Sequence, residues 1–400
     1  MPRSVDVVIV GGGMAGGMLA AALAPAGLKV LLLDAMQAPL MPEGEAGLRV
    51  SALTLSSERL LQQVGVWPHL PSDRLQSYTR MNVRDGDGTG EVCFNAAEAG
   101  VDHLGTLVEN QSVVAALYQH CSADANIEWR CEARVTALSR VGDGWQVTLA
   151  DDNVFACRLL VGADGARSMV RSVAGLRASP HDTGHIAIVA TLATTQSHQG
   201  CARQVFLDSG PLALLPLFGD GHRCSLVWSV WPDVASELMA LSEDAFSRRL
   251  SQACQDWLGD INLCSERQAF PIQDLHAGAY VAEGVALIGD AAHVVHPLAG
   301  QGINMGLLDA AVLAEEIRRA LDVGRDWHSL ALLQRYERRR RGHNASMVSA
   351  MRGFKLLFEQ RSPVLRFIRN AGMNLVDRHH LFKGMLSRQA TGQFDDTPVL

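Results

Sequence analysis

Several features that would identify other protein classes are missing from this sequence. Only 19% of its 400 residues are charged, 6% are aromatic, and the formal net charge is −7. This acidic balance argues against nucleic acid as a partner, because phosphate backbones are bound by clustered cations. No run of eighteen apolar residues free of Gly and Pro occurs, so no transmembrane helix is expected.

The cysteines follow neither a metal-binding nor a disulfide pattern. Eight of them are scattered along the chain without a CxxC pair, at positions 93, 121, 131, 157, 201, 224, 254 and 264. In a chain of this length they are interpreted as reduced, mostly buried thiols of a cytoplasmic protein. No nucleophile triad and no metal-ligand cluster is recognisable, so no metal site is predicted.

The most specific pattern lies in the first forty residues. An apolar strand, Val5–Val10, leads into the glycine turn Gly11–Gly16, a helix to Ala26, and a second strand, Lys29–Leu33, followed by Asp34. This is the order of a dinucleotide-binding unit. The apolar N-terminal stretch is therefore interpreted as strand and helix, and not as a secretory signal.

Each position of this unit has a physical reason. Gly11 permits a tight turn, Gly13 lets a pyrophosphate approach the backbone, and Gly16 lets helix and strand pack closely. The helix N-terminus offers free N–H groups and roughly half a positive charge to a phosphate. Asp34 is placed to accept hydrogen bonds from an adenosine ribose. The pattern predicts a dinucleotide, and it does not distinguish NAD from FAD.

Two later stretches repeat the arrangement of a strand followed by an acid. Leu159–Gly162 precedes Asp164, and a helix with Arg171 follows. Gly284–Gly289 precedes Asp290, and Gly300-Gln301-Gly302 then opens a long helix. Both acids are predicted to contact ribose or ribityl hydroxyls. For Asp164 the alternative is an Asx-turn cap, with Arg171 pairing to it.

The chain is expected to form a mixed α/β protein with two joined domains, since 400 residues exceed one simple core. The region from His185 to Arg267 is rich in predicted strands, which indicates a second, antiparallel sheet. The expected division assigns 1–73, 97–178 and 278–330 to the nucleotide domain, 74–96 and 179–277 to the sheet domain, and 331–400 to a helical region.

The sequence also predicts the structure of three further segments. A helical pattern follows Arg49 and ends at Gly65, which places this cation close to the nucleotide or on the surface. Two C-terminal helices are predicted, Leu332–His343 with a solvated basic run, and Met347–Phe358 with an apolar stripe that suits a core, a membrane or a partner. Residues Thr391–Leu400 are expected to be frayed.

Three motifs together resemble the flavoprotein aromatic hydroxylases of the p-hydroxybenzoate hydroxylase type. They are GxGxxG at Gly11–Gly16, DGxxSxxR at Asp164–Arg171 and GDAAHxxxPxxGQGxN at Gly289–Asn304. The resemblance narrows to the bacterial ubiquinone-biosynthesis hydroxylases through Arg49–Leu53, Val108–Asn110, His296–Gly302 and Arg335–Arg338. Ala202–Phe206 and Cys224–Ser229 look most like the 2-octaprenylphenol 5-hydroxylase branch.

The resemblance implies a Rossmann-like FAD-binding domain with an inserted substrate-binding sheet. It also implies which residues contact FAD: Gly11, Gly13, Gly16, Asp34, Arg49, Gln111, Asp164, Arg171, Asp290, Pro297, Gly300, Gln301, Gly302 and Asn304. His293, His296 and Pro297 are catalytic candidates in the loop beside the flavin ring. For the two histidines, a structural role in that loop is the alternative.

The implied reaction is the hydroxylation of a lipophilic polyprenylphenol through a C4a-hydroperoxyflavin, with NAD(P)H as reductant and O2 as co-substrate. A ubiquinone-biosynthesis complex and peripheral contact with the inner membrane are implied as partners, and self-association is left open. Rival hypotheses are a sibling hydroxylase acting at another ring carbon, a flavin monooxygenase of secondary metabolism, and a non-catalytic scaffold. A flavin halogenase is disfavoured, because Trp228–Pro232 lacks the WxWxIP spacing.

Overall fold

The protein is described by a computed structural model. It describes residues 2–86, 88–295, 301–359, 363–379, 383–384, 391–392 and 398–400. The architecture is mixed α/β, as the sequence predicts.

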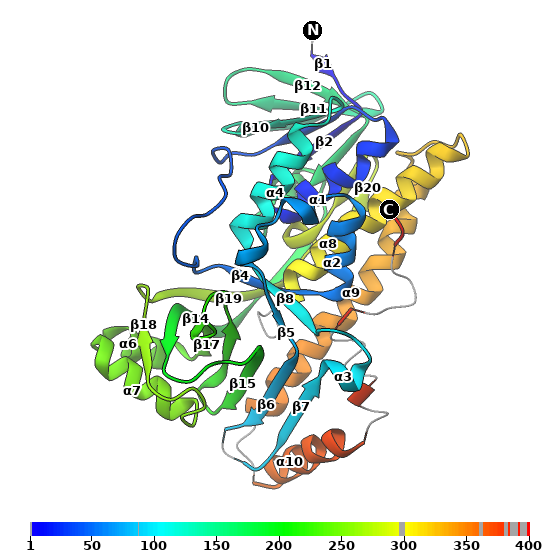
Figure 1. The fold of residues 1–400 in the computed structure, drawn as a ribbon. Coiled ribbons are helices and arrows are strands. Elements are labelled where there is room, and N and C mark those ends of the chain that lie inside the picture. Colours follow the sequence, from blue (N-terminus) through cyan, green and yellow to red (C-terminus); the bar gives the residue numbers. More distant parts are fainter. Residues whose placement is uncertain are drawn as a thin grey trace.

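A mostly parallel sheet lies at the centre of the N-terminal half (Figure 1). In spatial order its strands are β20 (Val281–Ala282), β21 (Val285–Leu287), β13 (Leu159–Gly162), β2 (Val7–Val10), β3 (Val30–Leu33) and β9 (Ile127–Arg130). All neighbours from β21 to β9 run parallel. Strands β2, β3, β13 and β21 are buried along their full length, because both faces of the sheet are covered.

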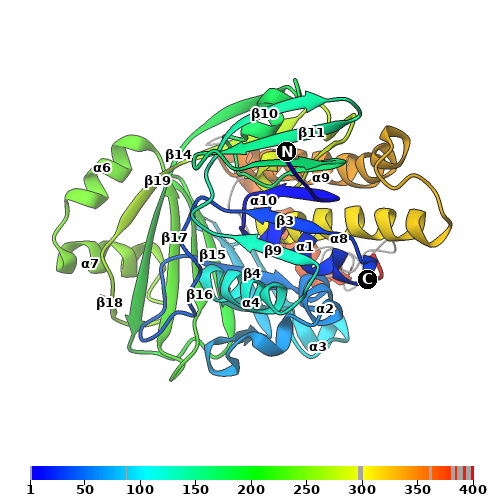
Figure 2. The same ribbon diagram turned by 90° about the horizontal axis from the view of Figure 1, so that it is seen from above.

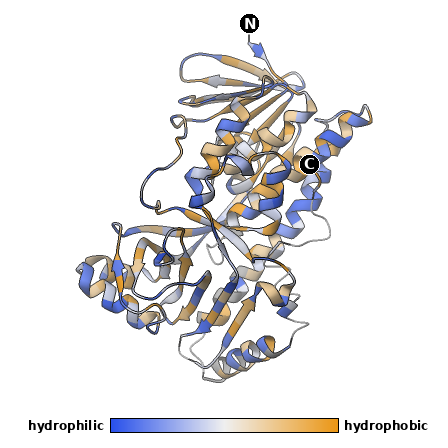
Figure 3. Ribbon diagram, in the orientation of Figure 1, coloured by the Kyte–Doolittle hydropathy of each residue, from blue (hydrophilic) through white to orange (hydrophobic). Residues whose placement is uncertain are grey.

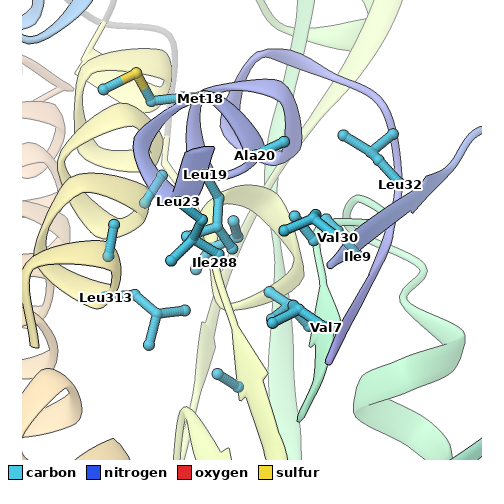
Figure 4. Packing of buried hydrophobic residues seen from close by; sticks show 14 of the residues in the cluster. Val7, Ile9, Met18, Leu19, Ala20, Leu23, Val30, Leu32, Ile288 and Leu313 are labelled. Carbon is cyan, nitrogen blue, oxygen red and sulfur yellow. The ribbon is translucent and has the colours of Figure 1, made fainter. Parts of the chain in front are cut away.

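The two covering layers differ in kind. On one side lie α1 (Met14–Leu23), α4 (Asn110–Ser122) and α8 (Gln301–Asp322). On the other side lies a small sheet of β1 (Arg3–Ser4), β12 (Val154–Cys157), β11 (Gly144–Leu149) and β10 (Val135–Val141) (Figure 2). The small residues of α1 pack against both the central strands and α8 (Figure 4). This close packing fixes the N-terminus of α1 over the carboxyl ends of the strands.

A second, larger sheet forms the other half of the molecule (Figure 1). Its strands are β22 (His293–Val294), β19 (Gln268–Ala277), β14 (Ala178–Thr194), β17 (Arg223–Val230), β16 (Gly210–Pro216), β15 (Cys201–Leu207), β6 (Arg80–Asp85) and β7 (Glu91–Asn95), with β18 (Ile261–Leu263) paired to β14. Because β6 pairs with β15, residues 80–95 and 178–277 share this sheet. The division into domains stays a prediction.

A third sheet bridges the two halves and corrects one expectation. It contains β4 (Val50–Thr54), β8 (Gly105–Glu109) and β5 (Gln76–Tyr78). The helix expected directly after Arg49 is therefore wrong over its first turn: 50–54 pair with β8, and α2 (Leu55–Gln63) begins after Thr54. The Thr54 side chain caps that helix by accepting from the Ser57 N–H.

The remaining helices lie mainly at the periphery. They are η1 (Ala24–Ala26), η2 (Trp67–His69), η3 (Ser72–Arg74), α3 (Ala96–Ala99), α5 (Met169–Val173), α6 (Pro232–Ala240), α7 (Glu243–Ala253), η4 (Gly289–Ala291), α9 (Leu330–Glu359) and α10 (Pro363–Arg378). Apolar residues concentrate in the central strands and α1, whereas polar residues run along much of α9 (Figure 3). Among the described helices, none combines the length and hydropathy needed to cross a bilayer.

Two expectations for the C-terminal region are wrong. The helices predicted at 332–343 and 347–358 are one continuous helix, α9. Of its basic run, Arg335, Arg338 and Arg341 are exposed as expected, whereas Arg340 is only 3% exposed. The described part of the last ten residues is attached to the fold. Thr391 is buried, the Ser56 hydroxyl donates to the Gly392 carbonyl, and the Val399 N–H donates to Glu315.

Candidate functional site

Three sequence motifs meet at one edge of the central sheet. Strands β2, β13 and β21 are direct neighbours, and Gly162 is in register with both Val10 and Leu287. The glycine turn follows β2, Asp164 follows β13, and η4 with Asp290 follows β21. The carboxyl ends of parallel strands are where α/β proteins bind nucleotides.

The glycines allow these segments to touch. A Cβ atom on Gly11, whose φ is +109°, would lie 2.2 Å from the Ala163 carbonyl oxygen. On Gly16 it would lie 2.0 Å from the Gly11 carbonyl oxygen, and on Gly289 3.1 Å from the Cβ of Ala15. The expected reasons for Gly11 and Gly16, a tight turn and close helix–strand packing, match this geometry.

Gly13 differs from its neighbours because the space beside it is open. It is the N-cap residue of α1, with an ordinary φ of −74° and no side-chain cap. A Cβ built there would meet nothing within 4 Å. Uncapped backbone N–H groups beside open space are what a pyrophosphate requires, so the residues present fit a dinucleotide.

Asp34 lies beside the same turn. Its Oδ1 accepts from the Met36 N–H at 3.0 Å. A Cβ on Gly12 would come within 2.4 Å of its Oδ2. Gly12, to which the sequence analysis gave no role, therefore lets the acid approach the turn. The run of three glycines in the sequence is the feature from which a role of Gly12 could have been predicted.

Asp164 and Arg171 make hydrogen bonds within the chain. Asp164 accepts from the Ser168 hydroxyl at 2.5 Å and from the Met169 N–H at 2.7 Å, so it binds the first turn of α5, whose N-cap residue is Ser168. The alternative of an Asx-turn cap paired with Arg171 is therefore met only in part, because the Arg171 guanidinium donates to the Ala166 and Ala291 carbonyls. Arg171 donates to the Ala291 carbonyl at 2.8 Å, which ties the second motif to the third. A contact of either residue with a cofactor stays a prediction.

Arg49 and Gln111 are brought together by the bridging sheet. The Asn110 N–H donates to the Arg49 carbonyl at 3.0 Å. The exposed Arg49 guanidinium lies 5.6 Å from the Phe270 ring centroid, at the second sheet. Gln111, at the start of α4, donates to the Leu40 carbonyl at 3.0 Å. Both residues thus flank the loop that joins β3 to β4.

A buried ion pair that the sequence analysis did not identify holds this loop. Glu109 and Arg74 are joined at 2.8 Å and 3.0 Å, and both are buried. Glu109 also accepts from the Gly47 N–H at 2.7 Å, and Arg74 donates to the Gly44 carbonyl at 2.9 Å. The pair therefore positions the segment that ends in Arg49. Its only sequence signal was Glu109 in the Val108–Asn110 stretch.

Asp290 follows β21 at the carboxyl edge of the central sheet. Its side chain is exposed to solvent, yet desolvation by the surrounding protein raises the pKa of its carboxyl, with His293 opposing the shift. An exposed carboxylate at this edge suits hydroxyl groups of a ligand, which can donate to it.

The residues near the start of α8 divide into three groups. His293 is 1% exposed, and its Nε2 lies 2.5 Å from Asp309. Asn304 is buried, accepts from the Ser57 hydroxyl at 2.7 Å and donates to the Ala52 carbonyl at 2.9 Å. Gln301 and Gly302 begin α8, while His296, Pro297 and Gly300 lie outside the described residues. Within the described ranges no group of His, Cys, Asp and Glu could hold a metal ion.

The fold and this edge define a dinucleotide-binding protein, and comparisons with known proteins identify it as an FAD-dependent monooxygenase. The sequence profile of the family described as FAD binding domain matches residues 4–351. The chain belongs to this family, and FAD is its cofactor.

Curated relatives and a solved structure agree with this class. The chain is 37% identical to ubiquinone hydroxylase UbiL of Rhodospirillum rubrum, covering 98% of this chain and 90% of the relative. It is 34% identical to the 3-demethoxyubiquinol 3-hydroxylase of Escherichia coli, covering 97% of each. PqsL of Pseudomonas aeruginosa, titled a probable FAD-dependent monooxygenase, superimposes with a TM-score of 0.78 at 26% identity, covering 93% of this chain and all of that one.

Proposed function

We propose that this protein hydroxylates the ring of a polyprenylated phenol during ubiquinone biosynthesis, at C5 of 2-octaprenylphenol. The convergence of three flavin motifs at one sheet edge supports a flavin hydroxylase. End-to-end similarity to hydroxylases whose names refer to ubiquinone supports the pathway. The resemblance of 202–206 and 224–229 to the 2-octaprenylphenol branch favours this ring position.

Different residues at this sheet edge would bind different parts of FAD. The α1 N-terminus at Gly13 would hold the pyrophosphate, Asp34 the adenosine ribose, and Asp290 the ribityl chain. Arg49 would lie toward the flavin, in a loop held by Arg74 and Glu109. Bound FAD would supply the redox chemistry, taking electrons from NAD(P)H and activating O2 for transfer of one oxygen atom to the ring.

We propose that an apolar face of the second sheet forms a wall of the substrate site. Val189, Val227 and Ala213 are in register across β14, β17 and β16, and all are half-buried. They face away from the core formed with α6 and α7. Thr191, on the same face of β14 as Val189, approaches the Ala46 carbonyl at 3.5 Å, so this face looks toward the Arg49 loop. Such a wall would bind an apolar ring and exclude water from the reaction.

A deletion strain tests the proposal. Without this protein, cells should accumulate unhydroxylated octaprenylphenol, and expression of the wild-type chain should restore ubiquinone, both read by mass spectrometry of quinone extracts. Accumulation of a demethoxyubiquinol instead would assign the chain to a sibling ring position. Normal ubiquinone in a strain without a redundant hydroxylase would refute the proposal, and purified protein that stays colourless after addition of FAD would favour a scaffold.

We also propose that α10 contacts the membrane in which such a substrate dissolves. Its inner face is polar: Asn370 and Asp377 accept from the Gly90 and Cys93 N–H groups of the β7 region. Its outer face carries Phe367, 74% exposed, and Leu375, 54% exposed, two helical turns apart. Positions 352–388 contain eight Lys and Arg against two acids in the sequence. Arg352, Arg369 and Lys383 pair with acids of the protein, and the other five suit an anionic bilayer.

A further inference from the structure

A carboxylate outside the predicted cofactor contacts lies at the centre of a buried polar cluster. Asp309 is on α8 and is 0% exposed. Its Oδ2 accepts from the Gly289 N–H at 3.1 Å and from His293 Nε2 at 2.5 Å. Its Oδ1 accepts from Arg340 Nε at 2.7 Å and from Asn344 Nδ2 at 3.0 Å. Each oxygen thus serves a different part of the molecule.

One oxygen holds both ends of the turn that carries Asp290. Gly289 comes just before Asp290, and His293 lies three residues after it in β22. Gly289 has a φ of +57° and packs against Ala15 of α1. The turn is thus fixed between Asp309 and the start of the glycine-turn helix. A small displacement of Asp309 would therefore move Asp290 relative to the N-terminus of α1.

The other oxygen joins this turn to α9. Arg340 also donates to the Asn344 side chain at 2.7 Å, so cation, amide and carboxylate satisfy one another. Burial alone would raise the pKa of Asp309, but His293 and Arg340 hold it well below its ordinary value. With the carboxylate ionised and accepting from Nε2, His293 must carry its proton on that nitrogen. Asp309 therefore selects one orientation of the imidazole.

The position of this pair suggests a role beyond stability. Replacing a buried ion pair by apolar side chains of similar volume is often neutral or stabilising, so such a pair is weak evidence for a stabilising role. This pair instead gives directional hydrogen bonds to the turn that carries Asp290. Directional contacts behind a ligand-binding group are what keep that group in its productive geometry.

We propose that Asp309 is a positioning residue for the flavin site: it presents Asp290 to the ribityl chain and couples that contact to α9 through Arg340 and Asn344. This inference rests on the proposed FAD site. It predicts that a substitution on α9, remote from the cofactor, changes FAD affinity through Asp309.

The test compares two neighbouring arginines of α9. Arg340→Gln removes the contact with Asp309, whereas Arg339→Gln removes ion pairs with Glu315 and Glu316 that also join α9 to α8. FAD titration of the apoprotein should show affinity weakened by about tenfold for Arg340→Gln and Asp309→Asn. The Arg339→Gln control should stay within about twofold of wild type, even where its melting temperature falls equally. The visible spectrum of bound flavin should shift only in the first two variants.

A double-variant cycle with Asp290→Asn distinguishes positioning from general loosening. If Asp309 acts through Asp290, the double variant Asp290→Asn/Asp309→Asn should bind FAD about as weakly as Asp290→Asn alone. Additive losses would overturn the proposal, and so would a folded Asp309→Asn or Arg340→Gln protein with wild-type affinity and spectrum. Should Asp309→Asn fail to fold, the double variant Asp290→Asn/Arg340→Gln distinguishes additive from non-additive losses of FAD affinity in the same way. Wild-type protein that binds no FAD would instead refute the cofactor site itself.

Discussion

At the scale of single residues, the glycines of the N-terminal turn have different roles. Gly11 and Gly16 are required by the chain itself, because any side chain there would collide with backbone atoms. Gly13 is not, since it has an ordinary backbone conformation and open space beside it. Its lack of a side chain therefore points to a ligand and not to folding.

This difference makes Gly13 a clean test of the pyrophosphate site. Gly13→Glu should fold normally yet lose FAD affinity, because a carboxylate there blocks the approach and repels phosphate. Gly13→Gln is the matched control of equal size without charge. We expect Glu to weaken binding at least about fivefold more than Gln in flavin fluorescence titrations, given roughly 1–4 kcal/mol for a charge pair near 4 Å. Equal affinities in the two variants would show that no phosphate of FAD binds beside Gly13.

At the scale of elements, α10 departs most from the ordinary arrangement. An amphipathic surface helix normally turns its apolar face inward. Here Arg369 and Asn370 are buried and hydrogen-bond to Asp85 at the end of β6, while Phe367 and Leu375 face outward. In Figure 1 this helix lies at the end of the molecule opposite the N-terminus, beyond β6 and β7. The helix thus presents an apolar outer surface away from the central sheet.

Replacing this outer face should reduce membrane binding without affecting the fold. Phe367→Ser/Leu375→Ser is expected to lower sedimentation with anionic vesicles by roughly tenfold or more, since each buried side chain contributes about 1.5–3 kcal/mol. Val141→Ser/Val323→Ser is the control, because these two apolar residues are comparably exposed, one in β10 and one in the turn after α8. Identical sedimentation of the two double variants would contradict the assignment. Equal binding to neutral and anionic vesicles would exclude the charge contribution.

At the scale of the whole molecule, buried neutral histidines make the fold sensitive to acid. Burial lowers the pKa of His198 and of His276 below the ordinary value of 6.5. The hydrogen bonds of His198 also favour the neutral form: its Nδ1 accepts from the Gly200 N–H at 3.0 Å, and its Nε2 lies 3.1 Å from the Leu217 carbonyl. A proton added to Nδ1 would break the hydrogen bond with Gly200. The folded protein therefore resists protonation more than the unfolded chain does.

Stability should consequently decline on the acid side of neutrality. A group whose pKa is depressed by folding contributes fully above its unfolded pKa and loses that contribution as the pH falls through the folded value. The melting temperature should therefore be lower at pH 5 than at pH 7.5, by about 2 °C or more, in calorimetry at constant ionic strength. The decline should shrink in His198→Gln. A melting temperature that is as high or higher at pH 5 than at pH 7.5 would show that the histidines are not held neutral.

The local sequence pattern was sufficient to predict those features that depend only on residues close together in the chain. The strand, glycine turn, helix and Asp34 were predictable because each part satisfies its own backbone requirements within a few residues. The same holds for the strand-rich region after His185 and for the start of α8. Family membership followed from three such local motifs, since their order along the chain is itself a property of the sequence.

Only the tertiary structure decided what depends on distant partners. Residues 50–54 form a strand because β8 offers a ladder, and Arg340 is buried because Asp309 neutralises it. The Arg74–Glu109 pair and the outward apolar face of α10 likewise arise between segments far apart in sequence. Helical or basic patterns cannot reveal such pairings, because burial of a charge is determined by the partner that meets it and not by the residue itself.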